Sequence, residues 1–163
     1  MEMNMNYIYA FDLSLSSSGV CIFDEKGNPI KIMSIPTTSK MEHKDRLKII
    51  ADNWLELRGQ YSTNLIILES GFSRHAASTQ AIFKVVGLTQ YLFNDCRQVV
   101  YAPSSVKKIV TGNGRSDKSV VQGKILEMFP YIRFENQDQS DSVAIGLCYF
   151  IEQGIIPWRN SDA

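Results

Sequence analysis

Short apolar runs alternate with polar turns over the first 35 residues and predict three strands. The runs cover residues 7–11, 19–23 and 29–35, and they are rich in β-branched and aromatic side chains. A serine-rich stretch separates the first two runs, and residues 24–28 have the composition of a turn. Because strands joined by short turns pair antiparallel, we expect an antiparallel meander at the start of the fold.

Further along the chain, apolar spacing predicts helices that alternate with two buried strands. Leu47, Ile50 and Trp54 share one helical face, whereas the continuous apolar run 65–68 is typical of a strand buried on both sides. The predicted order is helix 42–57, strand 65–68, helix 75–93, strand 99–102, helix 103–110, a helix that is capped by Ser116 and ends before Pro130, and helix 139–153. We therefore predict the α/β class, with a mixed five-stranded sheet flanked by helices.

The bulk composition predicts a single domain spanning residues 1–163. The chain is 44% hydrophobic and 21% charged, which is ordinary for a globular protein. Its apolar runs are far shorter than the roughly 20 residues of a membrane span, and its start has no pattern of a secretory signal. Cys21, Cys96 and Cys148 are odd in number and widely spaced, which argues against a disulfide framework. We expect a cytoplasmic protein with no membrane partner.

Four acidic residues fall where strands end or where a helix begins, and we call them the four carboxylates: Asp12, Glu69, Asp138 and Asp141. Strand ends at one sheet edge are where open α/β sheets present ligands, and acids three apart on a helix project to one side. Carboxylates gathered there would repel one another unless a cation neutralised them. Hard oxygen ligands favour Mg²⁺, with Mn²⁺ as a substitute, and two such ions catalyse phosphodiester cleavage.

Each of the four carboxylates also has a purely structural interpretation. Asp138 and Asp141 could complement the dipole of a helix N-terminus, and Asp12 could be a turn former. Glu69 is harder to explain structurally, because it follows the apolar run Leu-Ile-Ile-Leu directly.

Overall neutrality counts against nucleic-acid binding, since the chain has 17 basic and 17 acidic residues. The charge is unevenly distributed, however. Residues 97–133 hold seven basic side chains against two acidic ones, a local net charge of +5. Lys107, Lys108, Arg115 and Lys118 flank a glycine-containing loop, where backbone and cations could approach phosphates; a solvated helix face is the alternative.

The order of these motifs resembles that of the RuvC-type Holliday-junction resolvases, which belong to the RNase H-like superfamily. The resemblance covers nearly the whole chain, from Tyr7 to Gln153. The motifs that carry it are Asp12 with Gly19 seven residues later, Glu69-x-x-Phe72, the basic segment 107–118, and Asp138-x-x-Asp141 opening the last helix. The short chain is more similar to the compact bacteriophage members than to the bacterial enzymes, which would place it in the cytoplasm of an infected bacterium.

The resemblance implies a homodimer that nicks opposed strands of a four-way DNA junction during recombination or phage DNA processing, leaving 5′-phosphate ends. The four carboxylates would bind two metal ions and a metal-bound water would attack. Phe72 would match an aromatic side chain that stacks on a base, although the residue by itself could equally belong to the core. Lys107 and Lys118 would match basic residues near the scissile phosphate, with Lys118 in the catalytic set. Lys108 and Arg115 complete the expected DNA-binding residues.

One departure and several alternatives remain open at this level. Leu13 and Ser14 follow Asp12 where the family commonly has Pro-Gly, so the turn can differ in shape from that of the family. Whether the protein selects four-way junctions strictly is also open. His75 could act as a proton shuttle or a phosphate contact, although a surface or capping histidine is the expectation. A broader flap or fork nuclease shares the same chemistry, and a non-catalytic DNA-binding module shares the same fold. A third alternative is an actin-like ATPase or sugar kinase, which shares this fold. Such enzymes need two of these domains facing one another, and a chain of 163 residues holds one. Helix 75–93 could be core or half of a dimer interface.

Overall fold

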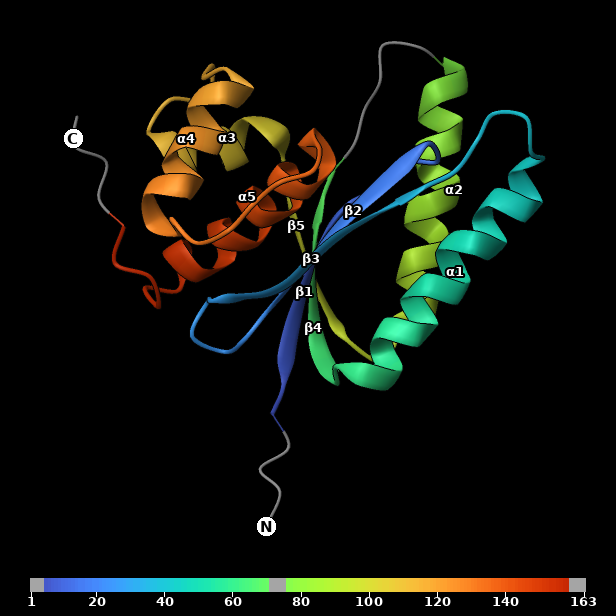
Figure 1. Cartoon of the computed structure of the whole chain (residues 1–163), viewed down its shortest axis with the longest axis horizontal. Coiled ribbons are helices and arrows are strands. Elements are labelled where there is room, and N and C mark those ends of the chain that lie inside the picture. Colours follow the sequence, from blue (N-terminus) through green and yellow to red (C-terminus); the bar gives the residue numbers. More distant parts are fainter. Residues whose placement is uncertain (1–4, 71–75, 159–163) are drawn as a thin grey trace.

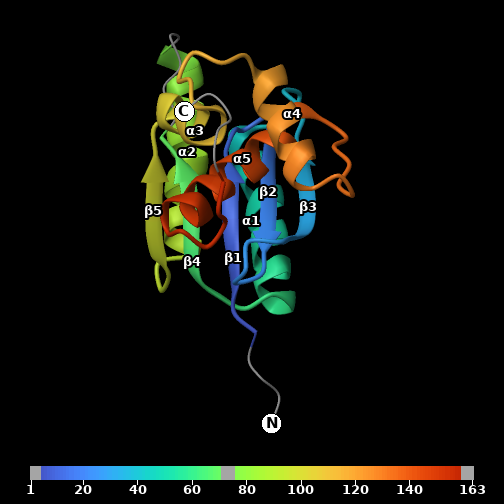
Figure 2. The ribbon, with the colours of Figure 1, turned by 90° about the vertical axis from the view of Figure 1, so that its left-hand side faces the viewer.

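Five strands form one mixed sheet at the centre of the molecule. The computed structural model describes residues 5–70 and 76–158. The strands are β1 (Tyr7–Asp12), β2 (Ser17–Phe23), β3 (Pro29–Pro36), β4 (Thr63–Glu69) and β5 (Arg97–Tyr101). Their order across the sheet is β3-β2-β1-β4-β5, with β1 antiparallel to β2 and parallel to β4 (Figure 2). The predicted meander and the mixed five-stranded sheet are therefore confirmed.

Helices cover both faces of this sheet. Two of them, α1 and α2, lie on one face, while α3, α4 and α5 lie on the other (Figure 1). Their bounds are α1 (His43–Gln60), α2 (Ala76–Leu92), α3 (Pro103–Thr111), α4 (Lys118–Met128) and α5 (Gln137–Glu152). Within the described residues, no helix is long and apolar enough to cross a membrane.

The period-two alternation of the strands divides the apolar side chains into two cores. In β1, Tyr9 and Phe11 belong to the core beneath α1 and α2, whereas Ile8 and Ala10 belong to the core beneath α3, α4 and α5. Trp54 of α1 packs against Phe11 with the rings tilted and their centroids 4.9 Å apart. This alternation continues to the strand ends and determines the face of the sheet toward which the last residue of each strand points.

Strand register brings two of the four carboxylates to one place. The parallel pairing of β1 with β4 aligns Phe11 with Leu68, so Asp12 and Glu69 follow at the same sheet edge. Since Phe11 and Leu68 face α1 and α2, the next residue of each strand faces α3, α4 and α5. The fold therefore directs both carboxylates toward the helices that carry Lys107, Lys118, Asp138 and Asp141.

Several predicted boundaries need correction. Helix α1 extends to Gln60, and α5 begins two residues before the predicted start at position 139. The prediction that Ser116 caps α4 is wrong: the N-cap is Asp117. Ser116 instead places its hydroxyl 2.7 Å from that of Thr111, which closes the loop between α3 and α4.

Candidate active site

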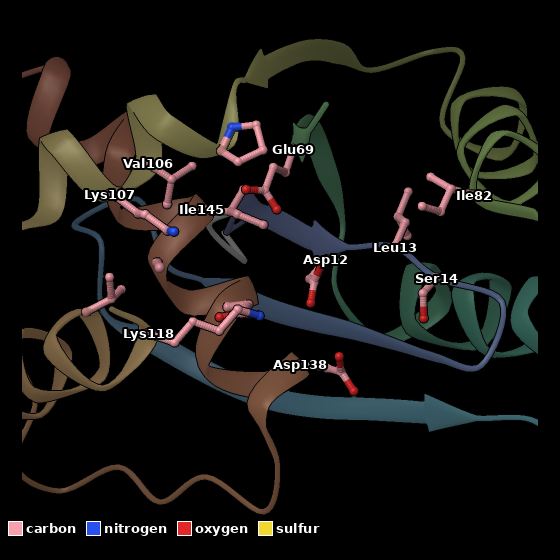
Figure 3. A pocket seen from close by; sticks show the side chains of 14 residues that line it. Asp12, Leu13, Ser14, Glu69, Ile82, Val106, Lys107, Lys118, Asp138 and Ile145 are labelled. Atoms are coloured by element: carbon pink, nitrogen blue, oxygen red, sulfur yellow. The ribbon is translucent and has the colours of Figure 1, made fainter. Parts of the chain in front are cut away.

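A cavity of about 410 Å³ opens at the sheet edge where β1 and β4 end (Figure 3). All four carboxylates line it, together with the two lysines that the resemblance places near the scissile phosphate, Lys107 and Lys118. Asp12 and Glu69 enter it from the strands, and the lysines enter from α3 and α4. The structure thus brings together residues from five elements that are up to 129 positions apart in the chain.

Gly19 allows the acid-bearing turn of α5 to approach the sheet. Gly19 pairs with Asp12 across β1 and β2, and a Cβ added to it would lie 2.2 Å from the backbone oxygen of Asp138. No side chain fits at that separation, because the obstacle is backbone. The neighbouring strand adds a tether, since Asn136 donates from Nδ2 to Ser34 Oγ at 2.8 Å. The spacing between Asp12 and Gly19 is thereby linked to the position of Asp138.

Asp141 is held from two sides. The Lys118 ammonium donates to Asp141 Oδ2 at 2.8 Å, and Gln137 Nε2 donates to Asp141 Oδ1 at 3.0 Å. Lys118 is the first residue of α4, where a positive charge is unfavourable because the helix dipole is positive there. Its hydrogen bond with Asp141 raises the pKa of Lys118 and keeps it charged. This lysine is better explained by the cavity it faces than by the helix it starts.

The cavity contains more negative charge than the protein neutralises. Burial, followed by the charges of Asp141, Glu69 and Asp138, raises the pKa of Asp12 to about 7. Burial is also the largest cause of the raised pKa of Glu69, followed by the charge of Asp141. Lys118 lowers both pKa values without restoring them to their ordinary range. The carboxyl groups therefore favour a bound cation.

The donor set is that of a hard divalent ion, although it is not gathered tightly. Within residues 5–70 and 76–158, no three acidic, histidine or cysteine side chains converge as a ready-made metal-binding group. The four carboxylates nevertheless share one cavity and supply only oxygen donors, which suits Mg²⁺ or Mn²⁺. The raised pKa of Asp12 is the electrostatic cost that such an ion would remove. The residues present therefore fit a divalent cation.

The turn after Asp12 is built from serines. Ser14 Oγ donates to the Ser17 carbonyl at 2.7 Å and accepts from the Ser17 N–H at 3.0 Å. Ser18 Oγ donates to the Ser14 carbonyl at 2.6 Å and accepts from the Ser14 N–H at 3.1 Å. These bonds satisfy a tight backbone turn without Pro-Gly, and they explain why a hydroxyl-rich sequence follows Asp12.

The other predicted site residues lie farther out or are not described. Lys108 and Arg115 are exposed and are not among the residues that line the cavity. Phe72 and His75 lie outside the described residues. Sequence reasoning missed Asn136 and Gln137, which fix the start of α5 and hold Asp141. The signal for Asn136 was available, since asparagine is a preferred N-cap, and its side chain accepts from the Gln139 N–H.

Comparison with known proteins identifies the family. The family model described as crossover junction endodeoxyribonuclease RuvC matches residues 8–149. The chain belongs to the RuvC family. The predicted family and its endonuclease class are therefore confirmed. The matched range ends within α5, so it includes all four carboxylates and both lysines of the cavity.

Relatives in sequence and in structure agree with this membership. The RuvC endonuclease of Halothermothrix orenii is 27% identical over 149 residues, covering 87% of this chain and 90% of that protein. The RuvC endonuclease of Alkaliphilus metalliredigens is 28% identical over 153 residues, covering 87% and 91%. Thermus thermophilus RuvC, solved in complex with a Holliday junction substrate, has a TM-score of 0.81 at 16% identity, covering 91% of this chain and 94% of that chain. This likeness confirms the predicted fold. The similarity to bacteriophage members stays a prediction.

Proposed function

We propose that this RuvC family member is a Mg²⁺-dependent endonuclease that nicks four-way DNA junctions symmetrically as a homodimer. The observation that carries the proposal is the single cavity in which the four carboxylates meet Lys107 and Lys118. Family membership adds the substrate class, because the matching model is that of a crossover junction endonuclease. The structure of a RuvC bound to a Holliday junction substrate supports the same choice.

In this proposal the four carboxylates hold two divalent ions, with Mn²⁺ as a substitute for Mg²⁺. When bound, these ions supply a nucleophilic water and stabilise the attacking and leaving oxygens. Asp12 and Glu69 provide ligands from the rigid ends of β1 and β4. Gln137 orients Asp141 through its 3.0 Å hydrogen bond.

The lysines are proposed to receive the phosphate. Lys118 contributes a positive charge close to Asp141, where negative charge develops during phosphodiester cleavage. Lys107 lines the same cavity from α3. Lys108 and Arg115 lie on the adjacent exposed surface, where they would contact phosphates farther along the strand. Phe72, expected to stack on a base, remains part of the proposal on the resemblance alone.

A homodimer is proposed because symmetric nicks require two active sites on one junction. Apolar side chains on α2 and β5 support this assembly: Phe83, Tyr91 and Val100 are 54%, 72% and 52% exposed. A hollow of about 150 Å³ lies between these two elements and is lined by Phe83, Val86 and Val100. Exposed apolar side chains on an edge strand and its neighbouring helix are typical of a surface that associates.

The proposal is tested with a synthetic four-way junction labelled on each strand, incubated with and without Mg²⁺. We expect paired nicks at symmetric positions near the branch point, ending in 5′-phosphates, and no cleavage with a chelator. Asp12→Asn and Glu69→Gln should each lower the cleavage rate by at least about 100-fold, since each removes a proposed metal ligand.

Matched substrates test the junction selectivity. A fork, a flap and a linear duplex of the same sequence should be cut much more slowly than the junction. Equal rates on flap and junction would replace junction resolution with a broader branched-DNA activity. Undiminished cleavage by Asp12→Asn would show that the proposed active site is wrong.

A further inference from the structure

The cavity has two chemically different sides. Lys107 and Lys118 project from α3 and α4 on one side of Asp12 (Figure 3). Leu13, in the turn after β1, and Ile82, in α2, lie on the opposite side. Both aliphatic side chains are half-buried, so each retains surface toward the cavity. A DNA strand that placed a phosphate between Asp12 and the lysines could extend along this aliphatic side.

Leu13 is held firmly in that position. It packs against the core beneath α1 and α2, and the serine turn described above fixes the backbone on its C-terminal side. Ser14 lies beside it in the cavity lining, but its hydroxyl hydrogen is donated to the Ser17 carbonyl and is committed to the turn. Among the described residues that line the cavity, the side chains that this side offers to a substrate are therefore mainly those of Leu13 and Ile82.

We propose that Leu13 and Ile82 select deoxyribose over ribose in the nucleotide beside the scissile phosphate. This inference rests on the proposed function and adds a basis for its choice of sugar. The sugar is bonded directly to the phosphate, so a phosphate held beside Asp12 brings a sugar within reach of the neighbouring Leu13. Aliphatic side chains suit the C–H surface of a deoxyribose, whereas bases are usually received by aromatic rings.

A ribose at this position carries a 2′-hydroxyl that an aliphatic wall leaves without a partner. A buried hydroxyl that loses its hydrogen bonds to water is penalised in the bound state. The 2′-hydroxyl is also the group by which proteins distinguish RNA from DNA. Leu13 stands where the family commonly has a proline, so this contact belongs to the present chain rather than to the shared catalytic set.

The experiment compares cleavage of three otherwise identical four-way junctions in Mg²⁺. One is all DNA, and the other two carry a single ribonucleotide on the 5′ or the 3′ side of the mapped scissile phosphate. We expect at least one ribonucleotide substrate to be cut about tenfold more slowly by the wild-type protein. Leu13→Ser should reduce that ratio severalfold, because its hydroxyl can pair with the 2′-hydroxyl. Ile82→Ser should reduce it in the same direction.

Leu13→Met is the matched control, since it keeps an apolar side chain of similar volume and should keep the ratio. Each ratio is measured within one protein, so a general loss of activity or stability cancels. Equal rates on all three junctions, or a ratio that Leu13→Ser and Ile82→Ser leave unchanged, would overturn the inference. Failure of the wild-type protein to cut the all-DNA junction would instead overturn the proposed function.

Discussion

Asp12 ends a buried strand with a carboxyl group whose pKa burial raises to about 7, helped by Asp141, Glu69 and Asp138. An unfolded aspartate has a pKa near 4, so the metal-free folded protein binds this proton more tightly than the unfolded chain does. The stability that the proton contributes is complete below about pH 4 and is lost as the pH rises through about 7.

This linkage predicts that Asp12→Asn stabilises the metal-free protein at high pH. The gain in unfolding free energy should grow from about pH 4 to about pH 7 and then level off, at no more than about 4 kcal/mol. Urea unfolding in a chelator, repeated across this pH range, measures it. The same substitution should abolish cleavage, so stability and activity should move in opposite directions. Parallel pH profiles for the two proteins would contradict the assigned burial of Asp12.

The structural role of Gly19 could not be predicted from the residues next to it in the sequence. Its spacing from Asp12 is visible in the sequence, but a glycine within a strand has several explanations. Only the fold shows that α5 begins against it, with the Asp138 backbone 2.2 Å from where a Cβ would lie. Contacts between positions 19 and 138 depend on the packing of α5 across β2, which no local pattern encodes.

Gly19→Ala should therefore displace the start of α5. We expect a loss of about 1–3 kcal/mol in unfolding free energy, as for other overpacked sites, together with a cleavage rate reduced even where the protein is fully folded. Gly123→Ala is the control, because a Cβ there meets nothing within 4 Å and alanine favours the helix. Thermal unfolding and single-turnover cleavage measure both effects. A Gly19→Ala protein with wild-type cleavage would mean that the turn of α5 is not held by this contact.

At the scale of elements, helices and strands with strong periodicity were predictable, whereas their ends were not. The two-sided burial of β4 is visible in residues 65–68, and its parallel pairing with β1 and β5 agrees with the helices that connect these strands along the chain. The cap of α4 was misplaced because Ser116 and Asp117 are both favoured N-cap residue types, and in the fold the Ser116 hydroxyl pairs with that of Thr111. Side-chain partners from elsewhere in the fold thus decide boundaries that propensity leaves open.

The helices that carry the lysines are joined by a residue beyond the family match. Trp158 donates from Nε1 to the Val110 carbonyl in the last turn of α3 at 2.9 Å, and the Lys124 ammonium of α4 lies 5.6 Å from its ring centroid. This bond adds a side-chain donor to a carbonyl in the last turn of α3. Trp158 therefore connects α3 with α4, on which Lys107 and Lys118 are carried.

Trp158→Phe should remove the hydrogen bond and keep the ring beneath Lys124. We expect a loss of about 1 kcal/mol in unfolding free energy and faster amide exchange in the last turn of α3 and in α4. Trp158→Ala should have a larger effect on both elements. Hydrogen exchange of α1, which lies on the other face of the sheet, serves as the internal control. Exchange that rises equally in α1 and α3 would indicate global destabilisation and contradict a local connection.

At the scale of the whole molecule, the sequence left most open which surface joins two subunits. The surface proposed above is that of Phe83, Tyr91 and Val100. The helical spacing of residues 75–93 allowed either a core helix or half of an interface. The structure confirms the core part, since Val85 is fully buried, whereas Tyr91 on the same helix is 72% exposed and its place in an interface stays a prediction. Because a helix has several faces, one apolar-rich sequence can supply a core and a second apolar surface.

The proposed homodimer predicts that charge on this surface separates the subunits and uncouples the nicks. Val100→Lys places an ammonium on the exposed edge strand β5, and Tyr91→Lys places one on α2, where burial against a partner would require costly desolvation. Light scattering should then show a smaller mass, and junction cleavage should change from paired nicks to single, uncoordinated nicks.

Leu55→Lys is the matched control, because Leu55 is 53% exposed on α1. Since exposed substitutions usually alter stability by less than about 0.5 kcal/mol, a change in mass would reflect association rather than unfolding. Variants that keep the wild-type mass would move the interface elsewhere, and a wild-type monomer that still makes paired nicks would remove the dimer from the mechanism.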